Sequence, residues 1–263
     1  MIVEKQERAG KRLKEDRRKR MGDLIAQRQN ITMEALCQHF GVSMNTIRAD
    51  VAYLVKTGAV EKIYGGVRAA VHKQVPLFES RAMENTAHKK RIAAAAEDFI
   101  EDLDIIFIDA GTTTMHLIDR ISSSKRVTVV TGNLYVIQRA AEKENVNLIV
   151  LPGTMNRRTN SLTDVSTLEY LARYRFTKAF MGVSGVSEDG RLNVSTYMEY
   201  EIKRAAMKQS RAAYLLTDSA KFGSSGLMSY GTIAEVTAVI TDPKCPDFAK
   251  ELCKNNNISL IEV

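Results

Sequence analysis

The chain has 263 residues, of which 44% are hydrophobic, and a formal net charge of +7. This composition excludes a disordered protein, no apolar run approaches the roughly 20 residues of a membrane-spanning helix, and the basic N-terminus lacks the apolar segment of a secretory signal. The three cysteines are scattered and odd in number, which excludes a disulfide framework or a zinc pattern, so we expect a soluble cytoplasmic protein without metal or cofactor.

The positive charge is concentrated at the N-terminal end. Residues 1–68 carry a net charge of +6, and the rest of the chain carries only +1. Residues 1–16 read as a basic arm. A charge run alone is usually a solvated surface, but beside the helix-turn-helix predicted below it is expected to contact phosphates. The densest cluster consists of Lys11, Arg12, Lys14, Arg17, Arg18, Lys19 and Arg20.

A helix-turn-helix is predicted within residues 17–58. A first helix over 17–27 precedes a short amphipathic helix capped by Thr32 and ended by Gly41. A second helix begins after the cap Ser43 and stops at Gly58. Helix, glycine-containing turn and helix is the spacing of this motif. The apolar stripe of the second helix is Ile47, Val51, Leu54 and Val55.

A β-hairpin over residues 59–67, turning at Gly65-Gly66, would add a wing. Polar residues off the apolar stripe are of the types that reach base edges and phosphates. Three small helices packed for structural reasons alone are the alternative, and the charge distribution favours DNA binding. The predicted DNA-binding residues are Ser43, Asn45, Thr46, Arg48, Lys62 and Tyr64.

Residues 70–83 read as a linker from which Leu77 and Phe78 dock onto a neighbouring domain, and from about residue 84 short apolar strands alternate with helices. This alternation predicts an α/β domain with a mostly parallel sheet over 84–263. Helices are expected at 88–100, 113–121, 133–143, 164–173, 198–209 and 246–254. The expected strands are 105–108, 127–131, 148–151, 179–181, 213–216, 236–240 and 259–261.

Small and polar clusters follow most of these strands, at the edge where open parallel sheets bind ligands. Gly111 permits close backbone approach, and the threonines after it suit an anion such as phosphate. Lys221 and Arg157 would add positive charge, and carboxylate and amide groups would bind sugar hydroxyls. Singly, each of these residues is as well explained by a turn, a cap or a solvated face. The predicted ligand site comprises Asp109, Gly111, Thr112, Thr113, Thr114, Thr131, Asn133, Gly153, Arg157, Gly185, Glu199 and Lys221.

Other chemistry finds little support. Ser184 lacks the context of a nucleophile elbow, so no hydrolase triad is expected. None of the four histidines has a carboxylate or cysteine at metal-ligand spacing, and His116 fits best on a helix surface.

The chain resembles the DeoR family of bacterial sugar-metabolism regulators over residues 17–242. The N-terminal matches are Phe40-Gly41-Val42-Ser43, Thr46-Ile47-Arg48, Asp50, Gly58 and Tyr64-Gly65-Gly66. The C-terminal matches are Asp109-Ala110-Gly111-Thr112-Thr113, Asp218-Ser219, Lys221-Phe222-Gly223 and Ile240-Thr241-Asp242. The resemblance implies a winged helix (17–69) joined to an effector domain similar in fold to ribose-5-phosphate isomerase.

The sequence departs from the family pattern at three places. Ala49 replaces the usual second arginine after Thr-Ile-Arg, Gly132-Asn133 replaces Asn-Ser, and Pro152 replaces a glycine. The last two fall at the predicted ligand site, which favours an unusual effector.

The resemblance implies a regulator, usually a repressor, that binds operator DNA as a homodimer or homotetramer and is released by a phosphorylated sugar or polyol. Two alternatives remain at this point. One is a transcriptional activator. The other is a sugar-phosphate isomerase with a DNA-binding appendage, in which Asp109, Glu199 and Lys221 would do acid–base chemistry.

Overall fold

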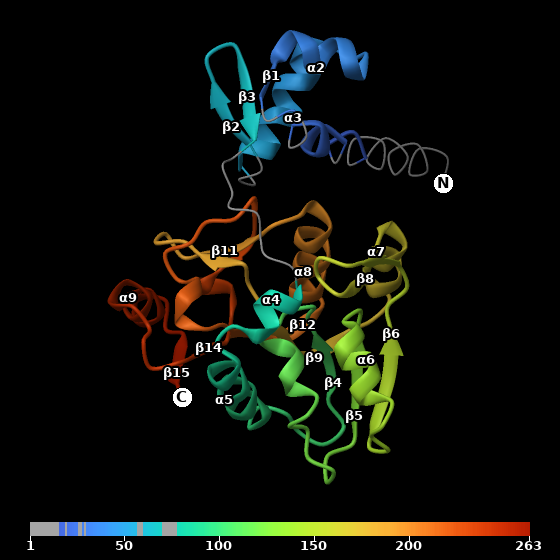
Figure 1. The fold of residues 1–263 in the computed structure, drawn as a ribbon, viewed down its shortest axis with the longest axis vertical. Helices are drawn as coiled ribbons and strands as arrows, with labels where there is room; N and C mark the ends of the chain where they lie inside the picture. Colours follow the sequence, from blue (N-terminus) through green and yellow to red (C-terminus); the bar gives the residue numbers. More distant parts are fainter. Residues whose placement is uncertain (1–15, 19, 26–27, 29, 57–59, 70–77) are drawn as a thin grey trace. The chain divides into compact units, whose positions relative to one another are not determined.

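A computed structural model describes residues 16–18, 20–25, 28, 30–56, 60–69 and 78–263 (Figure 1). The chain forms two compact units, which are described separately below. The N-terminal unit is residues 1–73 with 226–228, and the C-terminal unit is residues 74–225 with 229–263.

The N-terminal unit contains the predicted helix-turn-helix, α2 (Met33–Phe40) and α3 (Met44–Lys56). The predicted caps are confirmed: Thr32 Oγ1 accepts from Ala35 N at 3.2 Å, and Ser43 Oγ accepts from Thr46 N at 3.3 Å. Gly41 has φ +63°, the left-handed conformation that ends a helix at glycine. Gly58 lies outside the described residues. Side chains of the preceding helical segment and of the α3 stripe form the core, namely Met21, Ile25, Ile47, Val51 and Leu54.

The predicted hairpin is confirmed as β2 (Val60–Ile63) and β3 (Gly66–Ala69), but it turns one residue earlier than expected, at Tyr64-Gly65. A third strand that the sequence did not predict, β1 (Asn30–Thr32), pairs antiparallel with β3. This strand explains the shift, because a Cβ at Gly66 would lie 2.4 Å from the Ile31 carbonyl oxygen. Gly66 is therefore needed inside the sheet, and Gly65 (φ +74°) makes the turn.

The C-terminal unit is built on a parallel sheet of seven strands in the order β15-β14-β12-β9-β4-β5-β6. All seven predicted strands are confirmed, with ends that differ by up to three residues. They are β4 (Ile105–Ile108), β5 (Val127–Thr131), β6 (Val146–Val150), β9 (Phe176–Met181), β12 (Ser210–Leu216), β14 (Ala238–Thr241) and β15 (Ser259–Glu262).

The strand order defines a point where the direction of winding reverses. From β4 the chain moves outward through β5 to β6, then returns to β9 on the other side of β4 and continues through β12 and β14 to β15. Loops at the carboxyl ends of β4 and β9 therefore diverge, which leaves room for a ligand between them.

Helices cover both faces of this sheet. On one face, α5 (Thr86–Glu97) packs against β12 and β14, and α6 (Leu134–Ala140) packs against β5 and β6. Figure 1 shows both helices in front of the strands. On the other face, α8 (Tyr197–Lys208) packs against β9 and β12. The further helices are α4 (Phe78–Met83), α7 (Val165–Leu171) and α9 (Asp247–Asn255), and the 3₁₀ turns are η1 (Thr114–Leu117), η2 (Ser219–Lys221) and η3 (Ile233–Glu235).

Two segments differ from the expectation. Residues 78–83 of the predicted linker form α4, and Phe78 is buried in the core cluster of the C-terminal unit, while Leu77 lies outside the described residues. The helix expected over 113–121 is only the four-residue η1. The unpredicted short strands are β7 (Thr154–Asn156), β8 (Ser161–Thr163), β10 (Gly185–Val186), β11 (Arg191–Val194) and β13 (Met228–Thr232).

Candidate functional site

Asp109 lies at the reversal point, directly after β4. Its side chain is buried, and its Oδ2 accepts a 2.8 Å hydrogen bond from the main-chain N of Gly182, which directly follows β9. The two diverging loops are thus joined through one carboxylate. This is the position at which open α/β sheets bind ligands.

A buried lysine of α8 completes this junction. The ammonium group of Lys203 forms an ion pair with Asp109 Oδ2 and donates to the Gly182 carbonyl at 3.0 Å. The same carbonyl accepts a 3.0 Å hydrogen bond from Tyr230 Oη. Burial raises the pKa of Tyr230 well above its ordinary value, so the phenol remains a donor.

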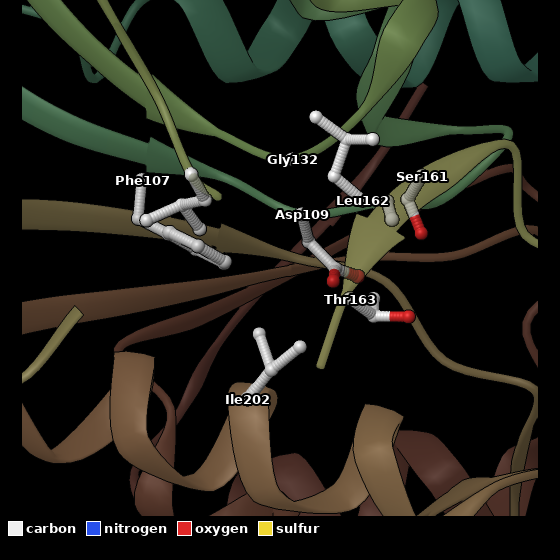
Figure 2. Close-up of a pocket in the computed structure, with 9 residues that line it drawn as sticks. Phe107, Asp109, Gly132, Ser161, Leu162, Thr163 and Ile202 are labelled. Atoms are coloured by element: carbon white, nitrogen blue, oxygen red, sulfur yellow. The ribbon is translucent and has the colours of Figure 1, made fainter. Parts of the chain in front are cut away.

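A small pocket opens beside this carboxylate (Figure 2). Figure 2 shows Asp109 between Ser161–Thr163 of β8 and Ile202 of α8. All hydrogen bonds recorded for this carboxylate among the described residues use Oδ2, which leaves Oδ1 to accept from a ligand. The lining residues are Phe107, Asp109, Ala110, Gly132, Leu151, Ser161, Leu162, Thr163 and Ile202.

The unusual glycine at position 132 has a packing explanation. Its carbonyl accepts from Leu162 N at 2.8 Å, and a Cβ there would lie 2.8 Å from the Leu162 carbonyl oxygen. Glycine therefore lets the β7–β8 hairpin close against the loop after β5. Gly153 has the same role at the start of the hairpin, since a Cβ there would lie 2.7 Å from Thr163 N.

Several predicted ligand residues instead hold the loops together. Thr114 Oγ1 donates to the Asp109 carbonyl at 2.8 Å and accepts from Gly111 N at 3.1 Å. Thr131 donates to the Ile108 carbonyl at 2.7 Å, and Asn133 caps α6 by accepting from Tyr135 N at 2.9 Å. Their polar atoms are used within the protein.

Thr112 and Thr113 differ from Thr114. Both are buried, yet no hydrogen bond of either hydroxyl is recorded in the described part of the chain. They are the threonines of this loop that remain available to a ligand.

The other predicted ligand residues are more widely spread. Lys221 ends η2, Gly185 begins β10, and Arg157 is exposed in the turn between β7 and β8. Glu199, in the first turn of α8, accepts from Thr196 Oγ1 at 3.0 Å. Of the three residues considered for isomerase chemistry, Asp109 lines the pocket, whereas Glu199 and Lys221 do not.

Sequence reasoning missed Lys203 and Tyr230 of this junction, and it also missed the buried Lys89 of α5. The sequence pattern could have identified the two lysines, because each lies within the apolar stripe of a predicted amphipathic helix. Lys203 shares a face with Ile202, Ala206 and Met207, and Lys89 shares one with Ile92, Ala93 and Ala96. A lysine on such a stripe indicates a buried charge that requires a partner.

His116 was expected on a helix surface, and this was wrong, because only 5% of it is exposed and no described residue forms a hydrogen bond with its Nε2. Burial lowers the pKa of His116 below its ordinary value near 6.5. As the pH falls, His116 therefore takes up a proton near pH 6.5 in the unfolded chain and only at a lower pH in the folded chain. The contribution of neutral His116 to stability is complete above pH 6.5 and decreases as the pH falls toward the folded pKa.

We expect His116→Gln to reduce the loss of stability between pH 7.5 and pH 5.5 by up to about 1.4 kcal/mol, because one pH unit of this range lies below the unfolded pKa near 6.5. Thermal unfolding at the two pH values measures this, with exposed His39→Gln as the control. Equal pH sensitivity of wild type and His116→Gln would contradict the assignment.

The candidate DNA-binding surface lies on the N-terminal unit. Asn45 and Arg48 of α3, Lys62 of β2 and Tyr64 of the turn are exposed, and Thr46 is half-buried. The side chain of Ser43, by contrast, is engaged as the cap of α3, where it also lies 3.0 Å from Thr46 Oγ1. Ala49, at one departure from the family pattern, is exposed beside Arg48.

Two arginines of the predicted phosphate-contacting cluster have an internal partner. Arg17 and Arg18 form ion pairs of 2.7 and 2.8 Å with Asp50, whose side chain is fully buried. The guanidinium of Arg18 also lies 4.0 Å from the centre of the Tyr53 ring. These arginines attach the first helix to α3.

The described residues contain no cluster of three metal-ligating side chains, and no described helix is long and apolar enough to cross a membrane. Burial raises the pKa of the Cys245 thiol to about 12, so this group stays protonated.

Comparison with known proteins identifies the chain. Family models match residues 17–73 to the DeoR-like helix-turn-helix domain and residues 84–243 to the DeoR C terminal sensor domain. The HTH-type transcriptional regulator IolR of Bacillus subtilis (strain 168) is 35% identical over 240 residues, which cover 91% of this chain and 96% of IolR. The Glycerol-3-phosphate regulon repressor of Escherichia coli (strain K12) is 29% identical over 238 residues, covering 90% and 94%.

Among solved structures, ribose 5-phosphate isomerase A of Methanocaldococcus jannaschii matches with a TM-score of 0.40 and 16% identity, over 53% of this chain and 55% of that chain. IolR and the Glycerol-3-phosphate regulon repressor are both named as transcriptional regulators. The regulator hypothesis is therefore confirmed over the isomerase alternative. The chain belongs to the DeoR family and is a transcriptional regulator with an N-terminal helix-turn-helix and a C-terminal sensor domain.

Proposed function

We propose that this regulator represses an operon for the catabolism of a sugar or polyol, and that a phosphorylated form of that compound releases it from DNA. The name of the Escherichia coli relative, a repressor of a glycerol-3-phosphate regulon, supports both parts of the proposal.

The observation that carries the proposal is the pairing of hydroxyl-binding and anion-binding groups around the reversal point of the sheet. Asp109 lines the pocket, and its Oδ1 can accept from sugar hydroxyls because the ion pair with Lys203 and the hydrogen bond from Gly182 both use Oδ2. Lys221 at the end of η2 has no carboxylate within ion-pair distance among the described residues, which leaves it available for a phosphate.

We assign DNA binding to residues 17–69 and effector sensing to residues 84–263. Of the predicted linker between them, residues 78–83 form α4 of the C-terminal unit. Asn45 and Arg48 would contact bases or phosphates in the major groove, while Lys62 and Tyr64 would contact the backbone at the wing. A single winged helix makes too few contacts for strong specificity, so a homodimer or homotetramer on repeated half-sites is expected.

Control of DNA binding follows from linkage. An effector that binds better to the arrangement of the protein that cannot bind DNA shifts the population away from the operator. For an activator the preference is opposite: the effector binds better to the arrangement that binds DNA, and so it strengthens operator binding.

The operator is first selected from genomic fragments that the protein binds. The protein–operator complex is then titrated with sugars or polyols and, separately, with the phosphorylated form of each. We expect one phosphorylated compound to release the DNA while its free counterpart has no effect. Release by the free compound alone would overturn the phosphorylated effector. Tighter DNA binding in the presence of the phosphate would indicate the activator.

A further inference from the structure

The strand β6 forms one margin of the seven-stranded sheet. It pairs with β5 on one side, and no other described strand pairs with it, as Figure 1 shows. The main-chain groups on its other side therefore have no strand partner within the described part of the chain. Such groups are able to hydrogen-bond to a strand of another molecule.

Two hydrogen bonds at the ends of β6 show which of its residues face outward. Val127 N donates to the Asn145 carbonyl at 3.1 Å, and Leu151 N donates to the Thr131 carbonyl at 2.9 Å. Alternate residues of a strand serve the same neighbour, so the odd-numbered residues of 145–151 face β5. The N–H and C=O groups of the even-numbered residues face away from the sheet.

The outward side of β6 lacks the usual protection of a sheet edge, which is charge, proline or a covering element. The opposite edge strand, β15, has such protection, because α9 packs against it and its Glu262 forms a 3.1 Å ion pair with Lys250. In contrast, β6 reads Val-Asn-Leu-Ile-Val, and Val150 at its end is 39% exposed. An uncharged edge of this kind favours pairing with a further strand.

The helix α6 adds an apolar side chain beside this edge. Tyr135 and Arg139 both bind Asp119, at 2.8 and 2.9 Å, on the side of η1, which packs against β4. Val136 is buried against the sheet. Because successive residues of a helix are about 100° apart, Ile137 projects on the side away from Tyr135, toward β6. Ile137 is half-buried, so part of its surface is available to a partner.

A second copy of this chain fits the edge, because the sequence of β6 is nearly symmetric. Val146 and Val150 lie at equal distances on either side of Leu148. In an antiparallel pair centred on Leu148, this residue would lie opposite the same residue of the second copy, and Val146 would lie opposite Val150. All three are even-numbered, so their outward main-chain groups would meet. Apolar cross-strand pairs are favourable, and a strand without charge brings no like charges together.

We propose that β6 pairs antiparallel with β6 of a second copy, centred on Leu148, so that two sheets join across a twofold axis. Ile137 would extend the contact onto α6. This extension matters because stable interfaces bury roughly 1,200–2,000 Å², more than a five-residue strand supplies. The inference specifies the contact that forms the oligomer expected under the proposed function, and it does not depend on the effector.

The first test is Val150→Lys in the full-length protein, because a lysine on an edge strand opposes pairing. The matched control is Val165→Lys, which changes a valine that is 45% exposed at the start of α7. Analytical ultracentrifugation over a range of protein concentrations measures self-association, and circular dichroism verifies the fold. We expect the wild type and Val165→Lys to associate equally, and Val150→Lys to associate at least about tenfold more weakly.

The second test is a cross-link that reports the register. In the proposed pair the two Leu148 Cα atoms lie about 5.5 Å apart, within the roughly 4.4–6.8 Å that a disulfide spans. Oxidised Leu148→Cys should therefore run as a covalent dimer on a non-reducing gel. Val150→Cys should not, because four residues of strand place the two Val150 positions more than about 13 Å apart. Wild type oxidised in the same way controls for the three native cysteines.

Three results would each overturn the proposed contact. They are a monomeric wild type, unchanged association of Val150→Lys, and an oligomeric Leu148→Cys that forms no covalent dimer. The proposed function is judged separately, from the release of operator DNA by a phosphorylated compound. If that release occurs while the cross-link fails, the regulator stands and uses a different surface to associate.

Discussion

Replacing Lys203 with methionine is expected to destabilise the sensor domain by about 3–5 kcal/mol, because it leaves the Asp109 carboxylate buried without its cation. It also removes one of the two donors that the described residues supply to the Gly182 carbonyl, and the Tyr230 hydroxyl is the other. For a domain of this size the melting temperature should fall by roughly 10 °C.

Two further variants separate the ion pair from other effects of the substitution. Lys208→Met changes an exposed lysine of the same helix and should leave stability nearly unchanged. The double variant Asp109→Asn with Lys203→Met removes both charges but keeps an acceptor for Gly182 N, so it should recover much of the loss. If Lys203→Met melts within 2 °C of Lys208→Met, the pair is not important for stability.

Replacing Arg48 with alanine is expected to weaken operator binding by about 10- to 100-fold, the range measured for loss of one specific arginine contact. Arg48 is exposed on α3, and its neighbour Ala49 offers no charge to compensate for its loss. The affinity is measured on an operator fragment at a fixed salt concentration, with Arg175→Ala, an exposed arginine of the sensor domain, as a control of equal charge.

The salt dependence of binding then distinguishes two kinds of contact. If Arg48 binds a phosphate, the slope of log affinity against log salt should become shallower by about one unit; if it reads a base, relative affinities for mutated operators should change instead. Unchanged affinity in Arg48→Ala would remove this residue from the DNA-binding surface.

The sequence predicted most of the secondary structure because local signals were strong. Short runs such as Ile105–Ile108 and Val127–Thr131 are apolar and bounded by turn residues, so the strands of the buried parallel sheet could be recognised one by one. The caps Thr32 and Ser43 likewise act within three residues of themselves. The short strand β1 has no such signal, since it exists only because β3 is available to pair with it.

The candidate site was predicted only in outline. Gly-Thr and Asp after a strand indicate the ligand-binding edge, but they do not show which polar atoms remain available. Thr114, Thr131 and Asn133 belong to the pattern, yet the structure uses their side chains in the loops themselves. Short-range sequence patterns identify residue types that suit a ligand. They cannot show which of these side chains will instead form hydrogen bonds with the protein's own loops.

By itself, then, the sequence determined the two-part organisation of this protein, the order of its strands along the chain and its membership of a family of regulators, because these depend on local periodicity and motifs. The tertiary structure alone decided which charges meet. Lys203 reaches Asp109 across 94 positions, and Asp50 binds Arg17 and Arg18 from another helix. Such pairings depend on strand order and helix packing, which bring together residues whose separation in sequence carries no signal of contact.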